Sequence, residues 1–248
     1  MIYSSPQPTP FEIEEHYGLP PEQYWTDESY FQRTPDYFSR QISTAKKLLS
    51  KAEGLKSLDV GAGLGKAMLS MTSSGFDAFG FEPSQPFYDR AISRMNISPD
   101  RLKLGMIENV DYEPEMFDFI TFGAVFEHLY HPASCLKKAM KWLKRGGIVH
   151  IEVPNAKHLL PKIINFYYRL RGTNYVTHLS PMHSPFHLYE FGLRSFEKLS
   201  PKLAFSIADH YFDVGTLYHV PRMLHFPLSK YMKLTDTGMQ LTVFLQKI

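Results

Sequence analysis

A chain of 248 residues accommodates one large domain, or one domain with additions, and its 44% apolar and 21% charged residues are those of an ordinary globular protein. The net charge of +2 predicts no general attraction to nucleic acid or to acidic membranes. The single cysteine, Cys135, excludes an intrachain disulfide and a cysteine-rich metal site. Since the first residues lack a basic region followed by an apolar run, and no apolar run could span a bilayer, we expect a cytoplasmic protein without a membrane partner.

The N-terminal 34 residues are rich in Pro, Tyr and Glu and have little periodicity, which predicts an irregular segment. Its aromatic side chains favour ordered packing over disorder, so it forms either a loosely packed arm or a lid over a bound ligand. Residues 35–52 then have helical spacing, with Phe38 and Ile42 on one face, and Gly54 follows. We assign residues 1–52 to an N-terminal arm and helix that cap the rest.

A glycine-rich turn connects an apolar strand, residues 57–60, to a helix, residues 66–74. The glycines in it are Gly61, Gly63 and Gly65. Glycine allows the backbone to turn sharply and lets a ligand lie close against it. The helix that follows points free N–H groups and the positive end of its dipole at the same place. The turn is therefore a candidate ligand site.

A second strand, residues 76–81, is followed by Glu82, whose carboxylate can accept hydrogen bonds from both hydroxyls of a ribose. A dinucleotide site of the GxGxxG type needs glycine where Lys66 stands, and a Walker-type loop needs Ser or Thr where Ala67 stands. The spacing here is GxGxG. It favours a nucleoside without a bound polyphosphate.

Strands and helices continue to alternate along the chain. Helices are predicted at residues 83–95, 132–143 and 191–199, and strands at residues 102–105, 117–122, 148–153, 204–214 and 241–247. Alternation of this kind implies parallel pairing with right-handed crossovers. Residues 156–190 interrupt the pattern after the fifth strand.

The motifs DVGAGLG (residues 59–65) and GFEPS (residues 80–84) resemble the first two motifs of the class I S-adenosylmethionine (SAM)-dependent methyltransferases. A later stretch, residues 117–156, resembles their small-molecule branch, which includes ubiquinone-type O-methyltransferases. In it the motif EHL follows a predicted strand, LKRGG follows the next helix, and PN follows the next strand. The resemblance covers residues 53–156 well and 185–248 weakly. It implies SAM as the cofactor and an α/β fold with a doubly wound, mostly parallel seven-stranded sheet, whose last two strands are antiparallel to each other.

The resemblance also divides the chain after the N-terminal cap. It implies a cofactor-binding core at residues 53–155, a substrate lid at 156–190, and the remainder of the core with the last two strands at 191–248. The lid follows a strand at the edge where open parallel sheets bind ligands, and it is aromatic and basic. The predicted substrate-binding residues are Tyr168, His183, His187 and Arg222.

The cofactor-binding residues follow from the motifs. They are Asp59, Gly61, Ala62, Gly63, Gly65, Glu82, Pro83, Ile107, Glu108 and Gly123. The resembled family usually has an acidic residue for the adenine amino group where Met106 stands here. We therefore expect the Ile107 backbone N–H, an apolar contact of Ile107 with the ring, and Glu108 to serve the adenine side.

The fourth strand is followed by Glu127 and His128, the predicted catalytic residues. Methyl transfer to a hydroxyl needs a base beside the acceptor, and the ordinary pKa of histidine lies near neutrality, so His128 is the candidate base. The alternative is that His128 caps local backbone at the pocket wall. Both interpretations remain open from the sequence.

A metal site is a further alternative. The ubiquinone-type enzymes and the small-RNA 3′-terminal 2′-O-methyltransferases carry E-x-x-E-H here, and a later histidine completes a divalent-cation site. This chain has Glu127 and His128, with His183 and His187 downstream, but Ala124 replaces the first glutamate. Because the loss of a carboxylate weakens binding of a hard cation, we predict no metal.

The sequence leads to one preferred function and two alternatives. The preferred function is SAM-dependent methylation of a small molecule, on oxygen rather than nitrogen, with no nucleic-acid partner. The alternatives are an RNA 3′-terminal 2′-O-methyltransferase and a non-catalytic protein that binds the cofactor.

Overall fold

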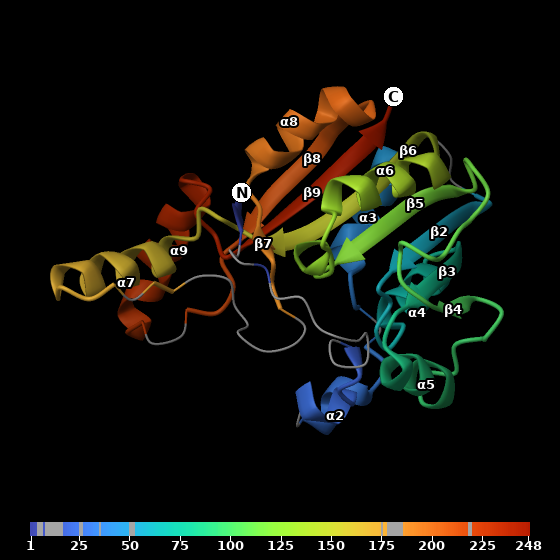
Figure 1. The fold of residues 1–248 in the computed structure, drawn as a ribbon, viewed down its shortest axis with the longest axis horizontal. Coiled ribbons are helices and arrows are strands. Elements are labelled where there is room, and N and C mark those ends of the chain that lie inside the picture. The colour runs from blue at the N-terminus through green and yellow to red at the C-terminus, as the bar shows by residue number, and fades with distance from the viewer. Residues whose placement is uncertain are drawn as a thin grey trace.

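The computed structural model describes residues 1–3, 7, 17–24, 27–34, 36–49, 53–174, 176–177, 186–217 and 220–248. Within these residues a seven-stranded sheet has the order β4-β3-β2-β5-β6-β9-β8 (Figure 1). Its strands are β2 (Leu55–Val60), β3 (Phe76–Glu82), β4 (Leu102–Leu104), β5 (Phe117–Gly123), β6 (Leu143–Pro154), β8 (Phe205–Asp213) and β9 (Gln240–Lys247).

The sheet is mostly parallel, as predicted. Strands β2 to β6 pair in parallel with their neighbours, whereas β9 is antiparallel to both β6 and β8. The predicted antiparallel pairing of the last two strands is therefore confirmed. The parallel strands end at one common edge of the sheet, which is where the crossover turns lie.

Helices cover both faces of the sheet, which confirms the doubly wound arrangement (Figure 1). They are α3 (Ser39–Leu48), α4 (Lys66–Ser73), α5 (Gln85–Ser93), α6 (Pro132–Trp142) and α8 (Leu193–Leu203). One buried cluster takes Ile42 from α3 and Met68 from α4. The other takes Trp142 from α6 and Phe196 from α8. Each face of the sheet thus has its own apolar core.

Strand β6 begins at Leu143, directly after α6, and not at residue 148 as predicted. The basic residues and glycines between these positions have the composition of a helix end. Leu143 nevertheless pairs with Phe117 of β5, and the register shifts before the next pair. A Cβ on Gly147 would lie 2.9 Å from the Lys144 carbonyl oxygen, so the irregular pairing requires glycine there.

The helices α7 (Leu159–Leu170) and α9 (Arg222–Leu234) lie beyond one end of the sheet (Figure 1). The sequence does not predict α9, because Pro227 argues against a helix interior. No helix in the described part of the chain is long and apolar enough to cross a membrane.

The N-terminal segment forms short elements that pack on the core. They are β1 (Ile2–Tyr3), α2 (Pro21–Tyr24) and the 3₁₀ turn η1 (Glu28–Phe31). β1 pairs antiparallel with β7 (Tyr189–Glu190), and Glu22 of α2 forms a 2.7 Å ion pair with Arg90 of α5. The helix predicted at residues 35–52 begins only at Ser39, because Phe38 has the left-handed backbone φ of 55°.

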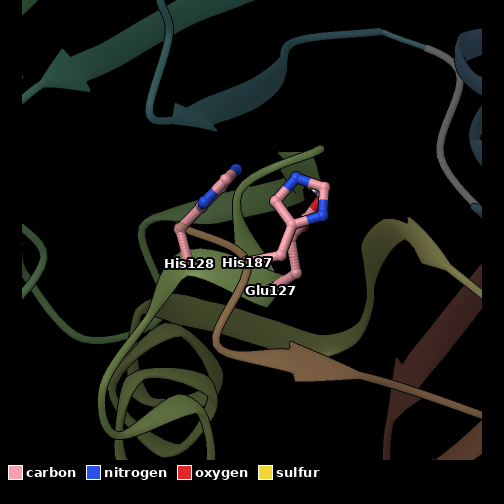
Figure 2. Close-up of side chains that lie close together, drawn as sticks. All are labelled: Glu127, His128 and His187. Carbon is pink, nitrogen blue, oxygen red and sulfur yellow. Dashed lines mark ion pairs between the residues drawn. The ribbon is translucent and has the colours of Figure 1, made fainter. Parts of the chain in front are cut away.

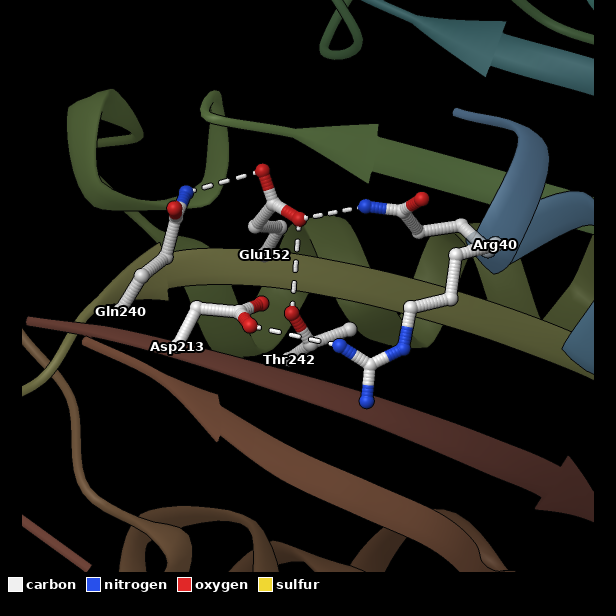
Figure 3. A network of polar contacts seen from close by, with 6 residues as sticks. Arg40, Glu152, Asp213, Gln240 and Thr242 are labelled. Atoms are coloured by element: carbon white, nitrogen blue, oxygen red, sulfur yellow. Dashed lines mark hydrogen bonds and ion pairs between the residues drawn. The ribbon is translucent and has the colours of Figure 1, made fainter. Parts of the chain in front are cut away.

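A polar network fixes α3 against the antiparallel end of the sheet (Figure 3). The Glu152 carboxylate on β6 accepts hydrogen bonds from the Gln41 side chain at 2.9 Å and the Gln240 side chain at 2.8 Å. Beside it, Arg40 pairs with Asp213 at 3.3 Å. These contacts hold α3 in place, and with it the aromatic residues that precede α3.

Candidate functional site

A cavity of about 600 Å³ opens at the carboxyl ends of β2, β3 and β5. Most of the predicted cofactor and catalytic residues line it. They are Asp59, Gly61, Ala62, Gly63, Glu82, Pro83, Ile107, Glu108, Gly123 and His128, together with His187 from the predicted lid. The parallel sheet brings these separate motifs to one edge, as expected for a ligand site in an open α/β fold.

Glu82 is held rigidly at the end of β3. Its Oε2 accepts from the Gly63 backbone N–H at 2.7 Å, and its Oε1 accepts from the Ser84 N–H at 2.9 Å. Burial raises the pKa of Glu82 to about 7, although the two backbone hydrogen bonds oppose this shift. Burial and the neighbouring Glu82 charge also raise the pKa of Asp59, to about 8. Each oxygen of the Glu82 carboxylate keeps a further lone pair that can accept from a ligand hydroxyl.

We expect nucleoside binding to depend on pH through Glu82. Only the ionised carboxylate can accept from both ribose hydroxyls, and the raised pKa leaves Glu82 protonated in the empty site below about pH 7. The dissociation constant for SAM should therefore rise by about tenfold for each pH unit below about 7 and level off above it. Calorimetry between about pH 5.5 and pH 7.5 measures this. A flat profile would contradict the ionisation assigned to Glu82.

The glycine turn has the predicted backbone freedom. Gly61, Gly63 and Gly65 have positive φ angles of 68°, 55° and 78°. A Cβ on Gly61 would lie 2.7 Å from a methyl group of Val125, so the turn is closed on that side. Gly65 does not line the cavity in the described structure: a Cβ there would lie 2.8 Å from Ile97. Gly65 therefore allows the turn to pack closely on the core next to the cavity.

Replacement of Gly65 by Ala should lower the free energy of unfolding by about 2–3 kcal/mol, because the positive φ and the overlap with Ile97 both oppose a methyl group. Gly172→Ala is the matched control. Its φ is +70°, and no described atom lies within 4 Å of an added Cβ, so we expect the free energy of unfolding to fall by only about 1 kcal/mol. Urea unfolding compares the two variants. Equal losses in the free energy of unfolding would mean that the contact with Ile97 does not contribute to the effect at Gly65.

The N-terminal segment supplies one wall of the cavity. Tyr17, Tyr30, Tyr37 and Phe38 line it, which supports the interpretation of this segment as a lid. A Cβ on Gly123 would lie 2.5 Å from the Phe38 ring, so this glycine makes room for an aromatic ring. None of these side chains is among the site residues predicted from the sequence. The only signal for them was the high density of aromatic residues near the N-terminus.

Lys66 is a further lining residue that the sequence prediction missed. Its ammonium lies 4.4 Å from the centre of the Tyr30 ring, and burial lowers the pKa of this lysine. The side chain is 8% exposed and begins α4 beside the glycine turn. The cavity therefore contains a cation at the end where the helix dipole is also positive.

Glu127, His128 and His187 form a compact cluster (Figure 2). The two histidines line the cavity, whereas Glu127, the other predicted catalytic residue, is buried behind them and does not line it. Glu127 and His128 lie in the 3₁₀ turn η2 (Phe126–His128) that follows β5, and His187 precedes β7. One ligand atom from each lies within 4.8 Å of the others, and His187 Nε2 is 4.0 Å from Glu127 Oε1. The Leu188 N–H donates to the Glu127 carbonyl oxygen at 2.8 Å, which joins the two segments.

The tautomer of His128 follows from its partner. His128 Nδ1 lies 2.9 Å from the Phe186 carbonyl oxygen, which can only accept, so Nδ1 carries a proton. In the neutral ring the lone pair is then on Nε2. That tautomer suits both a general base and a metal ligand.

The cluster has the donor set of a divalent-cation site. Glu127 is 1% exposed, and its Oε2 has no hydrogen-bond partner among the described residues. Burial raises the pKa of Glu127 to about 8. A buried carboxylate oxygen without a partner, together with two imidazoles, fits a borderline cation such as Zn²⁺, Mn²⁺ or Fe²⁺. Ala124, at the missing glutamate position, supplies no fourth side-chain ligand.

The predicted substrate residues separate into three groups. His187 lines the cavity, whereas His183 lies outside the described residues. The structure does not bring Tyr168 or Arg222 to the cavity, since neither is among the described residues that line it. They belong to α7 and α9, which both contribute side chains, among them Leu159 and Met232, to a separate small apolar cluster.

The comparison with known proteins agrees with this geometry. The profile of the family described as a methyltransferase domain matches residues 31–203. The chain belongs to this family. The family and the seven-stranded fold together identify a class I SAM-dependent methyltransferase, with SAM as its cofactor.

The methyltransferase has distant relatives of assigned function. It is 25% identical over 162 residues to the ubiquinone biosynthesis O-methyltransferase of Leptothrix cholodnii. The match spans 64% of this chain and 67% of that protein. The chain is 28% identical over 116 residues to the enzyme of the same name from Aliivibrio fischeri, and this match spans 44% of the chain and 49% of the relative. The chain thus spans between half and two thirds of these relatives.

The fold is also that of solved methyltransferases. An S-adenosylmethionine-dependent methyltransferase from Mesorhizobium loti superposes with a TM-score of 0.56 at 13% identity. The superposition covers 86% of this chain and 98% of that one.

Proposed function

We propose that this methyltransferase transfers the methyl group of SAM to a hydroxyl of a small molecule, with the acceptor held beside Glu127, His128 and His187. One observation carries the proposal: His128 and His187 of this cluster line the same cavity as Glu82, and Glu127 lies directly behind them. A nucleoside bound to Glu82 and an acceptor bound at the cluster would share one cavity. Both reactants would then meet without crossing bulk water.

The cofactor would extend across the cavity from Glu108 to the cluster. Glu82 would accept from the ribose hydroxyls, and Ile107 and Glu108 would contact the adenine. The Lys66 ammonium, beside the glycine turn, is a suitable partner for the carboxylate of the methionine part. In this orientation the sulfonium methyl would lie toward His128.

The chemical step needs one proton acceptor. As the acceptor oxygen forms its bond to the methyl carbon, the carbon–sulfur bond breaks, and S-adenosylhomocysteine forms. The hydroxyl proton passes to Nε2 of His128, whose Nδ1–H remains bonded to the Phe186 carbonyl oxygen. The hydrogen bond keeps the ring oriented for this transfer.

A divalent cation at the cluster is the second candidate mechanism, favoured by the unpartnered Oε2 of Glu127. Glu127, His128 and His187 would hold it, and it would lower the pKa of an acceptor hydroxyl. Turnover after treatment with EDTA separates the two mechanisms. Full retention supports direct base catalysis by His128, whereas a loss restored by Mn²⁺ or Zn²⁺ supports the cation.

The test of the proposed function measures S-adenosylhomocysteine formation with a panel of hydroxylated aromatic and sugar-containing acceptors. We expect micromolar binding of SAM and product formation with at least one small acceptor. SAM binding without turnover on small molecules or RNA would favour the non-catalytic alternative. Methylation of an RNA 3′ end alone would favour the RNA enzyme.

A further inference from the structure

The helices α7 and α9, here called the helix pair, pack on each other outside the two main cores (Figure 1). A small cluster joins them: Val214, Leu217 and Met232 are buried, and Leu159, Leu160, Val220 and Leu228 pack around them. Because α7 follows the carboxyl end of β6, the helix pair lies on the sheet edge that also carries the cofactor cavity. Much of each helix faces outward.

The outward face of α7 is apolar. Ile163, Phe166, Tyr167 and Leu170 have the spacing of one helix face and are 50%, 61%, 51% and 72% exposed. On another face, Asn165 contacts the chain that follows: the Thr177 N–H donates to Asn165 Oδ1 at 2.6 Å. A helix on an ordinary protein surface presents polar side chains outward, whereas α7 also exposes these four apolar ones.

Helix α9 has the same character. Its inner face supplies Met232 to the small cluster, with Leu228 against it. The outer face carries Met223, Phe226 and Leu234, which are 83%, 79% and 76% exposed. Scattered apolar residues on a surface are common, but two neighbouring helices that both direct aromatic and aliphatic side chains outward indicate a binding surface.

The helix pair is strongly basic. Residues 157–171 and 222–234 contain seven lysines and arginines and no aspartate or glutamate. The basic residues are Lys157, Lys162, Arg169, Arg171, Arg222, Lys230 and Lys233, and all are exposed. In the described part of the chain none of them forms an ion pair with an acidic side chain. Since the whole chain has a net charge of only +2, the rest of the molecule is acidic, and the whole-chain charge conceals this local excess.

We propose that the helix pair binds the surface of an anionic lipid bilayer. The exposed apolar side chains would enter the boundary between headgroups and acyl chains, and the seven cations would contact lipid phosphates. A second copy of this chain would bring like charges together. RNA would satisfy the cations but leave Ile163, Leu170 and Met223 without an apolar partner. A lipid surface satisfies both kinds of side chain.

The test is co-sedimentation of the full chain with vesicles of phosphatidylcholine that contain roughly 30% phosphatidylglycerol, and with vesicles of phosphatidylcholine alone. We expect binding to the anionic vesicles that weakens as salt rises. The triple variant Lys162→Gln, Arg169→Gln, Lys230→Gln should bind roughly 100-fold more weakly, since each cation near an anionic surface contributes roughly fivefold. The double variant Phe166→Ser, Phe226→Ser should lose about tenfold or more.

Matched controls test whether position matters. Arg194→Gln, Lys198→Gln, Lys202→Gln on α8 makes the same change in charge, and Leu104→Ser removes a 46% exposed apolar side chain from β4. Both controls should bind like the unmodified protein. All substituted side chains of the helix pair are exposed, so circular dichroism should stay unchanged.

Four results would overturn the proposal. They are absence of vesicle binding at low salt, equal binding to neutral vesicles, an equal effect of the control variants, and capture of single-stranded RNA without vesicle binding. A dimer that Phe166→Ser, Phe226→Ser dissociates, in a protein that ignores vesicles, would assign the surface to a second copy instead. Vesicle binding requires no turnover, so this test is independent of the proposed reaction.

Discussion

Replacement of Glu82 by Gln is expected to weaken SAM binding by about 100-fold, or about 3 kcal/mol. The carboxylate accepts from the Gly63 and Ser84 backbone N–H groups and, with ligand bound, from the ribose hydroxyls. An amide NH₂ cannot accept, so one of these backbone donors would lose its partner and one ribose hydroxyl would lose an acceptor. Calorimetry at about pH 7.5 measures the effect, since wild-type Glu82 is mostly ionised there.

Glu108→Gln is the matched control for this experiment. Glu108 also lines the cavity, but its carboxylate accepts only a long contact of 3.7 Å from the Cys135 thiol among its described interactions. We expect less than about tenfold loss from this change. If Glu82→Gln bound SAM within a factor of about three of the wild type, the ribose assignment would be wrong.

Replacement of His128 by Gln or by Ala is expected to lower turnover by about 100- to 10,000-fold while SAM affinity stays nearly constant. Neither side chain can take the acceptor proton. The glutamine amide can still donate to the Phe186 carbonyl oxygen, as His128 Nδ1 does at 2.9 Å. The pair of variants therefore separates proton transfer from backbone capping.

The turnover of the His128 variants is measured by single-turnover kinetics with saturating SAM. His210→Gln is the control, since His210 is exposed on β8 and is not among the described residues that line the cavity. Recovery of most activity in His128→Gln, with loss in His128→Ala, would show that His128 only caps the backbone. Full activity in both would remove it from the mechanism.

The sequence was sufficient for the parts of the site that depend on local patterns. Gly61 and Gly63 lie in the turn after β2, Glu82 ends β3, and a parallel sheet brings strand ends to one edge. Glu127 and His128 were found for the same reason, because they follow β5. Their approach to His187, which lies about 60 residues later, came from the resemblance to related enzymes and not from any local pattern.

The missed residues depend on packing between distant segments. The first 34 residues have no periodic pattern, so nothing in their sequence shows that Tyr17 and Tyr30 face the cavity. The substrate roles predicted for Tyr168 and Arg222 relied on position after a strand. Their helices instead pack on each other through a separate small cluster, which directs the exposed apolar face outward.

A crystal structure with S-adenosylhomocysteine tests the central claim most directly. The account predicts the ribose hydroxyls within about 2.6–3.2 Å of the Glu82 carboxylate and the sulfur turned toward Glu127, His128 and His187. A ligand bound elsewhere, or a sulfur turned away from this cluster, would contradict the account.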